Sequence, residues 1–214
     1  ISNNMIDLYT FGTPNGRKAS IMLEEVGLPY NVHTVHIGKD EQFAPEFLKI
    51  SPNNKIPAIV DHDVAGEPIS VFETGAILIY LAEKTASPLL PSEPRARADV
   101  MQWLMWQMGG QGPMFGQVNW FLGNQPDNQG AIERYINESV RLLGVLDRKL
   151  AEAEYVAGDY SIADIAIYSW HAGRIQDWMP EQRSGQLEAF ANVSRWQAAC
   201  AARPGVAKGM TVPS

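Results

Sequence analysis

The segment Thr13-Pro14-Asn15-Gly16 carries a hydroxyl and an amide at the predicted start of a helix. Proline is favoured at the first helical position because the N–H that it lacks would have no partner there, so Thr13 is the predicted N-cap. The Thr13 hydroxyl, the Thr13 N–H and the Asn15 side chain are expected to point toward the helix start. An incoming thiol would be stabilised there as a thiolate by these donors and by the helix dipole. A helix that is simply well capped is the alternative interpretation.

A second segment, Asn54 to Ile59, places Pro57 at the beginning of an apolar strand. Proline is unusual at that position unless the backbone geometry is special. A cis Ile56–Pro57 bond would turn the chain and leave the N–H and C=O of Ile56 outside the sheet, where they could pair with a peptide backbone. A plain turn with a trans bond, the commoner isomer of X-Pro bonds, is the alternative.

The third segment is Phe72-Glu73-Thr74-Gly75, at a predicted junction between a strand and a helix. Thr74 is the predicted N-cap, and the open N–H groups and positive end of the helix suit a carboxylate. Glu73 could receive an ammonium. Together these groups would recognise the head of an α-amino acid, such as a γ-glutamyl group. A capping residue beside a surface acid is the alternative.

Strands and helices alternate in the part of the chain that must position these segments. The order is βαβ, then α, then ββα, which is typical of a thioredoxin-like α/β domain. In such a domain the three segments lie on one edge, where together they would bind a tripeptide thiol. The predicted strands are 6–11, 30–37, 56–61 and 69–72, and the predicted helices are 14–26, 45–50 and 74–84.

A proline cluster at 88–94 indicates a linker, and the remaining pattern is entirely helical. We therefore predict a thioredoxin-like domain over 5–86 and an all-α domain over 94–214. Gly109, Gly110 and Gly112 with Pro113 are expected to break or kink the helical pattern, and Ser161 to Asp164 forms a capping box with a structural role. The predicted helices are 94–107, 129–152, 161–178 and 192–202.

The composition excludes several classes of protein. A formal net charge of -7 over 214 residues argues against a general nucleic-acid partner, and no apolar run approaches the length of a membrane span. The single cysteine, Cys200, cannot form an intrachain disulfide and is expected to be an inert packing residue. A reducing, cytoplasmic location follows by default, with Met5 interpreted as the native start. The four histidines show no metal-ligand spacing, so no metal is predicted.

The sequence resembles the glutathione S-transferases and is most similar to their bacterial nu class, with a likeness that covers nearly the whole chain. Many members of this family activate sulfur through a tyrosine at the end of the first strand, where this chain has Phe11. Others use Ser or Cys at the position of Thr13. The segments that carry the resemblance are 13–16, 51–59, 72–77, 103–110, 112–114 and 131–135.

The resemblance implies a role for each matching residue. Thr13 and Asn15 face the sulfur of glutathione, and Ile56, before Pro57, pairs with its cysteinyl backbone. The other implied roles are that Gln42 and Lys55 reach the glycine end, that Glu73 and Thr74 hold the γ-glutamyl head, and that Arg134 reaches the partner's ligand across a homodimer interface.

The resemblance also implies the activity of a glutathione-dependent disulfide-bond oxidoreductase. The thiolate of bound glutathione would attack a disulfide, with no protein cysteine involved. One alternative is a transferase that conjugates glutathione to electrophiles, and a second is a non-catalytic glutathione-binding or scaffold protein.

Overall fold

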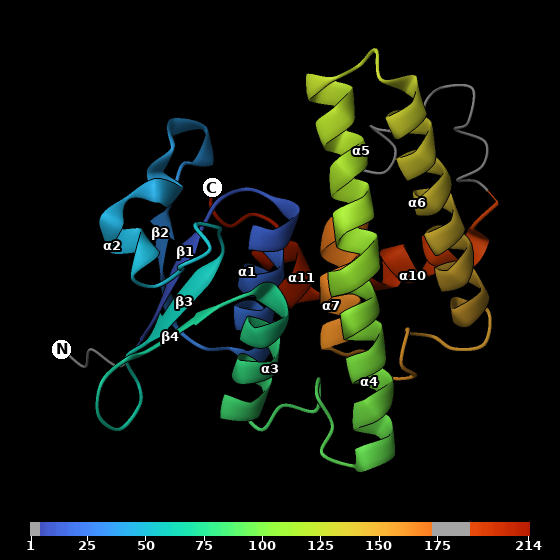
Figure 1. Cartoon of the computed structure of the whole chain (residues 1–214). Coiled ribbons are helices and arrows are strands. Elements are labelled where there is room, and N and C mark those ends of the chain that lie inside the picture. The colour runs from blue at the N-terminus through green and yellow to red at the C-terminus, as the bar shows by residue number, and fades with distance from the viewer. Residues whose placement is uncertain (1–4, 173–188) are drawn as a thin grey trace. The chain divides into compact units, whose positions relative to one another are not determined.

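The computed structural model describes residues 5–172 and 189–214. It divides into two compact units, which Figure 1 draws together. Unit 1 comprises Ile1–Leu90 and Ala202–Ser214, and unit 2 comprises Pro91–Ala201. Residues 202–214, which we expected in the helical domain, make their contacts in unit 1. The boundaries 5–86 and 94–214 stay predictions of where the chain divides into domains.

Unit 1 is built on a four-stranded mixed sheet with the order β2-β1-β3-β4. β1 pairs in parallel with β2 and antiparallel with β3, and β3 forms an antiparallel hairpin with β4. The predicted thioredoxin-like order of elements is confirmed. The strands are β1 (Ile6–Thr10), β2 (Tyr30–Thr34), β3 (Ala58–Asp61) and β4 (Ile69–Phe72).

Helices lie on both faces of this sheet (Figure 1). On one face, α1 (Pro14–Val26) packs beside α3 (Thr74–Lys84), over buried strand residues such as Leu8. On the other face, Phe47 of α2 (Pro45–Leu48) packs with Val35 and Ala58. The helix α1 ends at Gly27, which adopts the left-handed conformation with φ 68° that favours glycine.

Two predictions for unit 1 need correction. The second strand ends at Thr34, and the short 3-10 helices η1 (Ile37–Lys39) and η2 (Glu41–Phe43) follow. The sequence reasoning also missed α11 (Pro204–Gly209), which packs on α1. Gly209 lies so close to Ile21 that an added Cβ would stand 2.5 Å from the Ile21 Cα, so only glycine permits this packing.

Unit 2 is helical, as predicted, but its glycine-rich segment does not break the helix. α4 (Pro94–Trp106) passes through a π-helical turn, η3 (Gln107–Gln111), into α5 (Gly112–Asn124). The helical hydrogen bonding therefore shifts register without ending. The remaining described helices of unit 2 are α6 (Gln129–Leu150), α7 (Ile162–His171) and α10 (Ala191–Ala201).

The predicted capping box is confirmed at the start of α7, where Ser161 is the N-cap and Asp164 accepts from its backbone. α7 ends at His171, earlier than the predicted end at residue 178. The last six residues of that prediction, 173–178, lie outside the part of the chain that the structure describes.

Candidate functional site

The register of the sheet brings three loop segments to one edge of unit 1. Because β3 is antiparallel to both β1 and β4, the end of β1, the beginning of β3 and the end of β4 lie together. These are the points from which the chain continues to Thr13, enters from Pro57 and continues to Glu73. The predicted juxtaposition of the three segments is therefore a consequence of the sheet pairing.

At the start of α1, Thr13 is the N-cap, as predicted. Its Oγ1 accepts a hydrogen bond from the Gly16 N–H at 3.1 Å, so the hydroxyl proton is not used in this bond. The Thr13 N–H, which we expected to face the sulfur, instead donates to the Phe11 carbonyl at 2.7 Å. The hydroxyl is thus the group of Thr13 that can donate to a thiolate, while the half-buried Asn15 follows in the first turn.

Gly16 permits the tight turn between β1 and α1. A Cβ at this position would stand 2.2 Å from the Phe11 carbonyl oxygen and 2.6 Å from the Thr10 hydroxyl. The strand end and the helix start can approach this closely only because residue 16 has no side chain.

The loop before β3 contains the cis Ile56–Pro57 bond that the sequence predicted. A hydrogen bond within this loop stabilises its shape, because the Ser51 hydroxyl donates to the Lys55 carbonyl at 2.7 Å. β3 begins only at Ala58, and the N–H and C=O of Ile56 form no hydrogen bond with the described residues. These two groups can therefore pair with a peptide backbone, while the Lys55 side chain is exposed.

At the start of α3 the structure differs from the prediction by one residue. Glu73, not Thr74, is the N-cap, and no side chain caps the helix. Glu73 has φ 72° and ψ 119°, a backbone conformation that residues other than glycine rarely adopt. A strained residue beside an uncapped helix N-terminus suits a site for a carboxylate, whose charge the helix end would stabilise.

Beneath this helix start lies Lys18, a residue that the sequence reasoning missed. It belongs to α1, its side chain is 1% exposed, and its Nζ donates to the Thr74 hydroxyl at 3.1 Å. Burial lowers the pKa of Lys18 to about 7, and the charge of Glu73 opposes this shift. The available signal was its position four residues before Met22, in register with the apolar stripe of the helix.

Gln42, the residue implied at the glycine end, lies on η2 in the same unit. Its Oε1 is buried and has no hydrogen-bond partner among the described residues. A buried carbonyl oxygen without a donor is costly, so a donor supplied by a ligand would stabilise this side chain.

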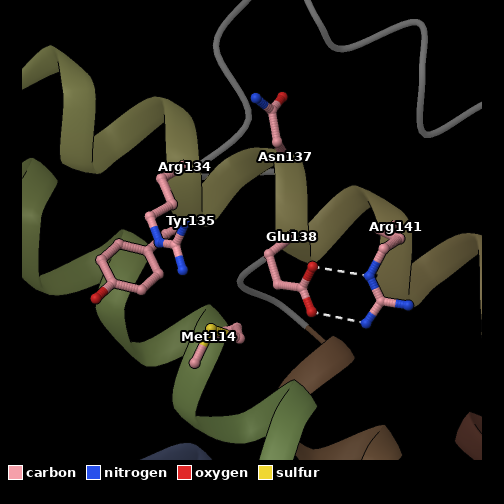
Figure 2. Close-up of a pocket in the computed structure, with 6 residues that line it drawn as sticks. All are labelled: Met114, Arg134, Tyr135, Asn137, Glu138 and Arg141. Atoms are coloured by element: carbon pink, nitrogen blue, oxygen red, sulfur yellow. Dashed lines mark hydrogen bonds and ion pairs between the residues drawn. The ribbon is translucent and has the colours of Figure 1, made fainter.

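Arg134 lies on α6 in unit 2. It lines a pocket of about 600 Å³ formed by Met114 on α5 and by residues of α6 (Figure 2). Glu138 and Arg141 pair there through two hydrogen bonds of 2.7 and 2.8 Å. Arg134 is exposed, and its positive charge helps Arg141 to lower the pKa of Glu138. Its guanidinium forms no hydrogen bond or ion pair with the described residues, so it is available to an anion.

Within residues 5–172 and 189–214, His, Cys, Asp and Glu side chains form no group that could hold a metal ion. In the same stretches, no helix has both the length and the apolar character needed to cross a membrane.

The chain matches two family models in sequence. Residues 13–84 match the N-terminal domain of glutathione S-transferase, and residues 114–204 match its C-terminal domain. The chain belongs to the glutathione S-transferase family.

Individual relatives agree with this assignment. The chain is 47% identical to the disulfide-bond oxidoreductase YfcG of Escherichia coli, over 96% of this chain and 94% of that protein. A second relative from the same organism, the disulfide-bond oxidoreductase YghU, is 38% identical over 99% of this chain and 76% of its own length.

Solved structures give the same result. A glutathione transferase from Pseudomonas putida, with one glutathione disulfide bound per subunit, is 46% identical and has a TM-score of 0.92 over 99% of this chain and 93% of its own. A family member from Pseudomonas fluorescens, with two glutathione molecules bound, is 48% identical and has a TM-score of 0.90 over 97% and 92%.

Proposed function

We propose that this protein is a glutathione-dependent disulfide-bond oxidoreductase that uses the thiol of bound glutathione. The observation that carries the proposal is the Thr13 hydroxyl, which caps α1 through its oxygen and keeps its proton for a sulfur anion. The single cysteine supports it, because Cys200 is completely buried in α10. Two relatives that span most of this chain are disulfide-bond oxidoreductases.

The proposed reaction has two exchange steps. The thiolate of the bound glutathione attacks one sulfur of a disulfide, a mixed disulfide forms, and the other sulfur leaves as a thiolate and takes up a proton. The thiolate of a second glutathione then attacks the glutathione sulfur of the mixed disulfide. Glutathione disulfide forms, and the second substrate sulfur leaves and is protonated. The substrate gains two electrons, two glutathione molecules lose them, and the protein keeps its oxidation state.

The protein would bind, orient and ionise the thiol. We assign Thr13 and Asn15 to the sulfur, and Ile56 with its following Pro57 to the cysteinyl backbone. We assign Gln42 and Lys55 to the glycine end of glutathione. We assign the γ-glutamyl head to Glu73 and Thr74 at the start of α3. A hydrogen bond to a charged sulfur contributes about 1.5–3 kcal/mol, so the Thr13 hydroxyl is the assignment with the largest expected effect.

We further propose that the protein acts as a twofold homodimer. The support is Arg134, an exposed cation that forms no hydrogen bond with the described residues and lines a pocket of about 600 Å³, from which it could reach the ligand of a second copy. Sedimentation at micromolar concentration is expected to give twice the 23.7 kDa of one chain. A monomer at that concentration would contradict this part of the proposal. The cytoplasm, where reduced glutathione is maintained, is the proposed location.

The test compares Thr13→Ala with Thr13→Ser. Loss of the hydroxyl is expected to lower glutathione-dependent disulfide reduction roughly 10- to 150-fold, whereas serine keeps the donor and most of the activity. Because the N-cap is also lost in Thr13→Ala, at about 1 kcal/mol of folding stability, both variants are assayed well below their melting temperatures.

A matched control is Cys200→Ala, which removes the thiol of the protein and is expected to retain turnover. If Cys200→Ala abolishes turnover while Thr13→Ala keeps it, the proposed mechanism is wrong. Faster conjugation of an aromatic halide than disulfide reduction by the wild-type protein would favour the transferase alternative.

A further inference from the structure

A pocket lies on the face of the sheet that α2 covers in unit 1 (Figure 1). Side chains alternate along β1, so Leu8 belongs to the buried core, whereas Asp7 and Tyr9 face α2. The pocket has a volume of about 600 Å³, which is in the range of small-molecule sites. None of the described residues that line it is one that we assign to glutathione, so it is a second candidate site.

Part of the pocket wall is aromatic and apolar. The rings of Tyr9 and His33 stack with their centroids 4.6 Å apart, and the Phe47 ring lies 6.3 Å from that of Tyr9. Ile50 and Val60 add aliphatic surface. An aromatic face attracts a cation as well as apolar groups. This wall therefore suits a ligand with an apolar body.

The polar part of the wall is organised around the Asp7 carboxylate. It accepts from Asn31 Nδ2 at 3.1 Å, from His33 Nε2 at 3.0 Å and from His62 Nε2 at 2.9 Å. Burial alone would raise the pKa of Asp7, but these hydrogen bonds bring it below its ordinary value, so the carboxylate is ionised. An ionised carboxylate only accepts, so both imidazoles donate through Nε2. Their Nδ1 atoms and the Tyr9 hydroxyl form no hydrogen bond with the described residues.

Negative charge predominates around this pocket. Its described lining contains three carboxylates, those of Asp7, Glu41 and Glu46. Lys49 supplies the one ammonium among the same residues, and its Nζ already pairs with Glu46 at 3.0 Å. The negative potential extends to the aromatic wall, because burial and the charge of Asp7 both raise the pKa of Tyr9. An anion would be repelled here, and a cation would be attracted.

We infer that this pocket binds a small organic cation, an amine whose body is aromatic or aliphatic. The body packs against Tyr9 and Phe47, and the carboxylates of the lining stabilise the ammonium. The N–H groups of the ammonium match the acceptor nitrogens that the neutral imidazoles keep. The inference goes beyond the proposed function and does not rest on it, because no residue of the thiol site takes part.

The experiment is an NMR titration of the ¹⁵N-labelled full chain at pH 8, where histidine is ordinarily neutral, with S-methylglutathione present in excess. Three probes of similar shape differ in charge: 2-phenylethylamine is a cation, 2-phenylethanol is neutral and phenylacetate is an anion. We expect the amine to shift the amide signals of Asp7, His33 and Phe47, with a dissociation constant on the order of 1 mM. The alcohol should bind about fivefold more weakly or less, and phenylacetate should cause no shift.

Glu46→Lys reverses one charge of the lining at a side chain that is 84% exposed, so the fold should be retained. We expect this variant to bind the amine about fivefold more weakly than the wild type. The matched control is Glu67→Lys, which makes the same change at an exposed residue outside the lining and should keep the affinity.

Equal affinity for the amine and the alcohol would overturn the assignment of a cation. Absence of any shift at about 20 mM amine, or shifts only at residues away from this face of the sheet, would overturn the site itself. Loss of the shifts when S-methylglutathione is added would place the amine in the thiol site and also refute the inference. A failure of glutathione binding would contradict the proposed function alone, since the amine titration can be followed without it.

Discussion

The N-termini of helices α3 and α7 differ in how their backbone N–H groups are capped. Every helix begins with N–H groups that have no partner within the helix. At α7, Ser161 and Asp164 satisfy these groups in a capping box. At α3, no side chain caps the helix, and its N-cap residue Glu73 is held at φ 72°.

The start of α7 is closed by its own residues. The two carboxylate oxygens of Asp164 accept from the N–H groups of Val156 and Ser161, from the Ser161 hydroxyl and from the Trp196 indole, at 2.8–3.4 Å. Burial raises the pKa of Asp164 to about 6, and these hydrogen bonds oppose the shift. Each of these four donors has the Asp164 carboxylate as its acceptor, so this constellation serves the fold.

The start of α3 is left open in a region that is otherwise well packed. Its N–H groups lack a side-chain cap, and Glu73 is held in a conformation that residues other than glycine rarely adopt. The comparison teaches that a cluster of buried polar residues is structural when its groups satisfy one another. It indicates a ligand when backbone strain and uncapped N–H groups remain.

The largest expected effect on folding stability is at the capped start of α7. Asp164→Ala would leave several buried donors without an acceptor, at about 1–3 kcal/mol each. We expect a loss of about 3–5 kcal/mol in the free energy of unfolding, measured in urea. Ser161→Ala is the matched control and should cost only about 1 kcal/mol, because the Asp164 carboxylate keeps its other donors. Equal losses in the two variants would contradict a central role for Asp164.

The second prediction concerns His171, a buried titratable group at the end of α7. Burial lowers the pKa of His171 to about 4, and its Nδ1 has no partner among the described residues. Because the unfolded chain binds this proton more readily, stability falls as pH decreases from about 6.5 to 4, by at most about 1.4 kcal/mol per pH unit. His171→Phe should remove this contribution.

Urea unfolding of His171→Phe and the wild type across that pH range is the measurement. Asp164 acts in the opposite direction, since its raised pKa favours the folded state as pH falls from about 6 toward 4. The difference between the two proteins, rather than either curve alone, therefore isolates the histidine. Parallel curves would show that His171 protonates equally well in the folded and unfolded chains.

The smallest expected effect tests the strain at the open helix start. Glu73→Gly should raise the free energy of unfolding by about 1 kcal/mol, because glycine tolerates a positive φ. The same variant should bind glutathione more weakly, since the proposed partner of its ammonium is lost. Glu73→Gln, which keeps the strain and removes the charge, should weaken binding without the gain in stability. A gain shared by both variants would assign it to charge instead.

The thiol-facing segments could be predicted from the sequence because their signals are local. Proline at the first helical position identified Thr13 as an N-cap, and proline at a strand start indicated the cis bond after Ile56. The alternation of apolar residues identified the strands of unit 1. Each of these features depends on the conformational preferences of a few neighbouring residues, so the sequence contains them directly.

Other features depend on tertiary packing between distant segments and could not be predicted from local sequence patterns. The Thr13 N–H turns to Phe11 because of the close approach at Gly16, and α11 returns to α1 through contacts far apart in the chain. Lys18 looks like an ordinary helical lysine in the sequence, yet it is completely buried in the fold. Burial is a sum over the folded neighbours, and backbone strain is imposed by them, so what distinguishes the uncapped start of α3 from the capped start of α7 exists only in the folded molecule.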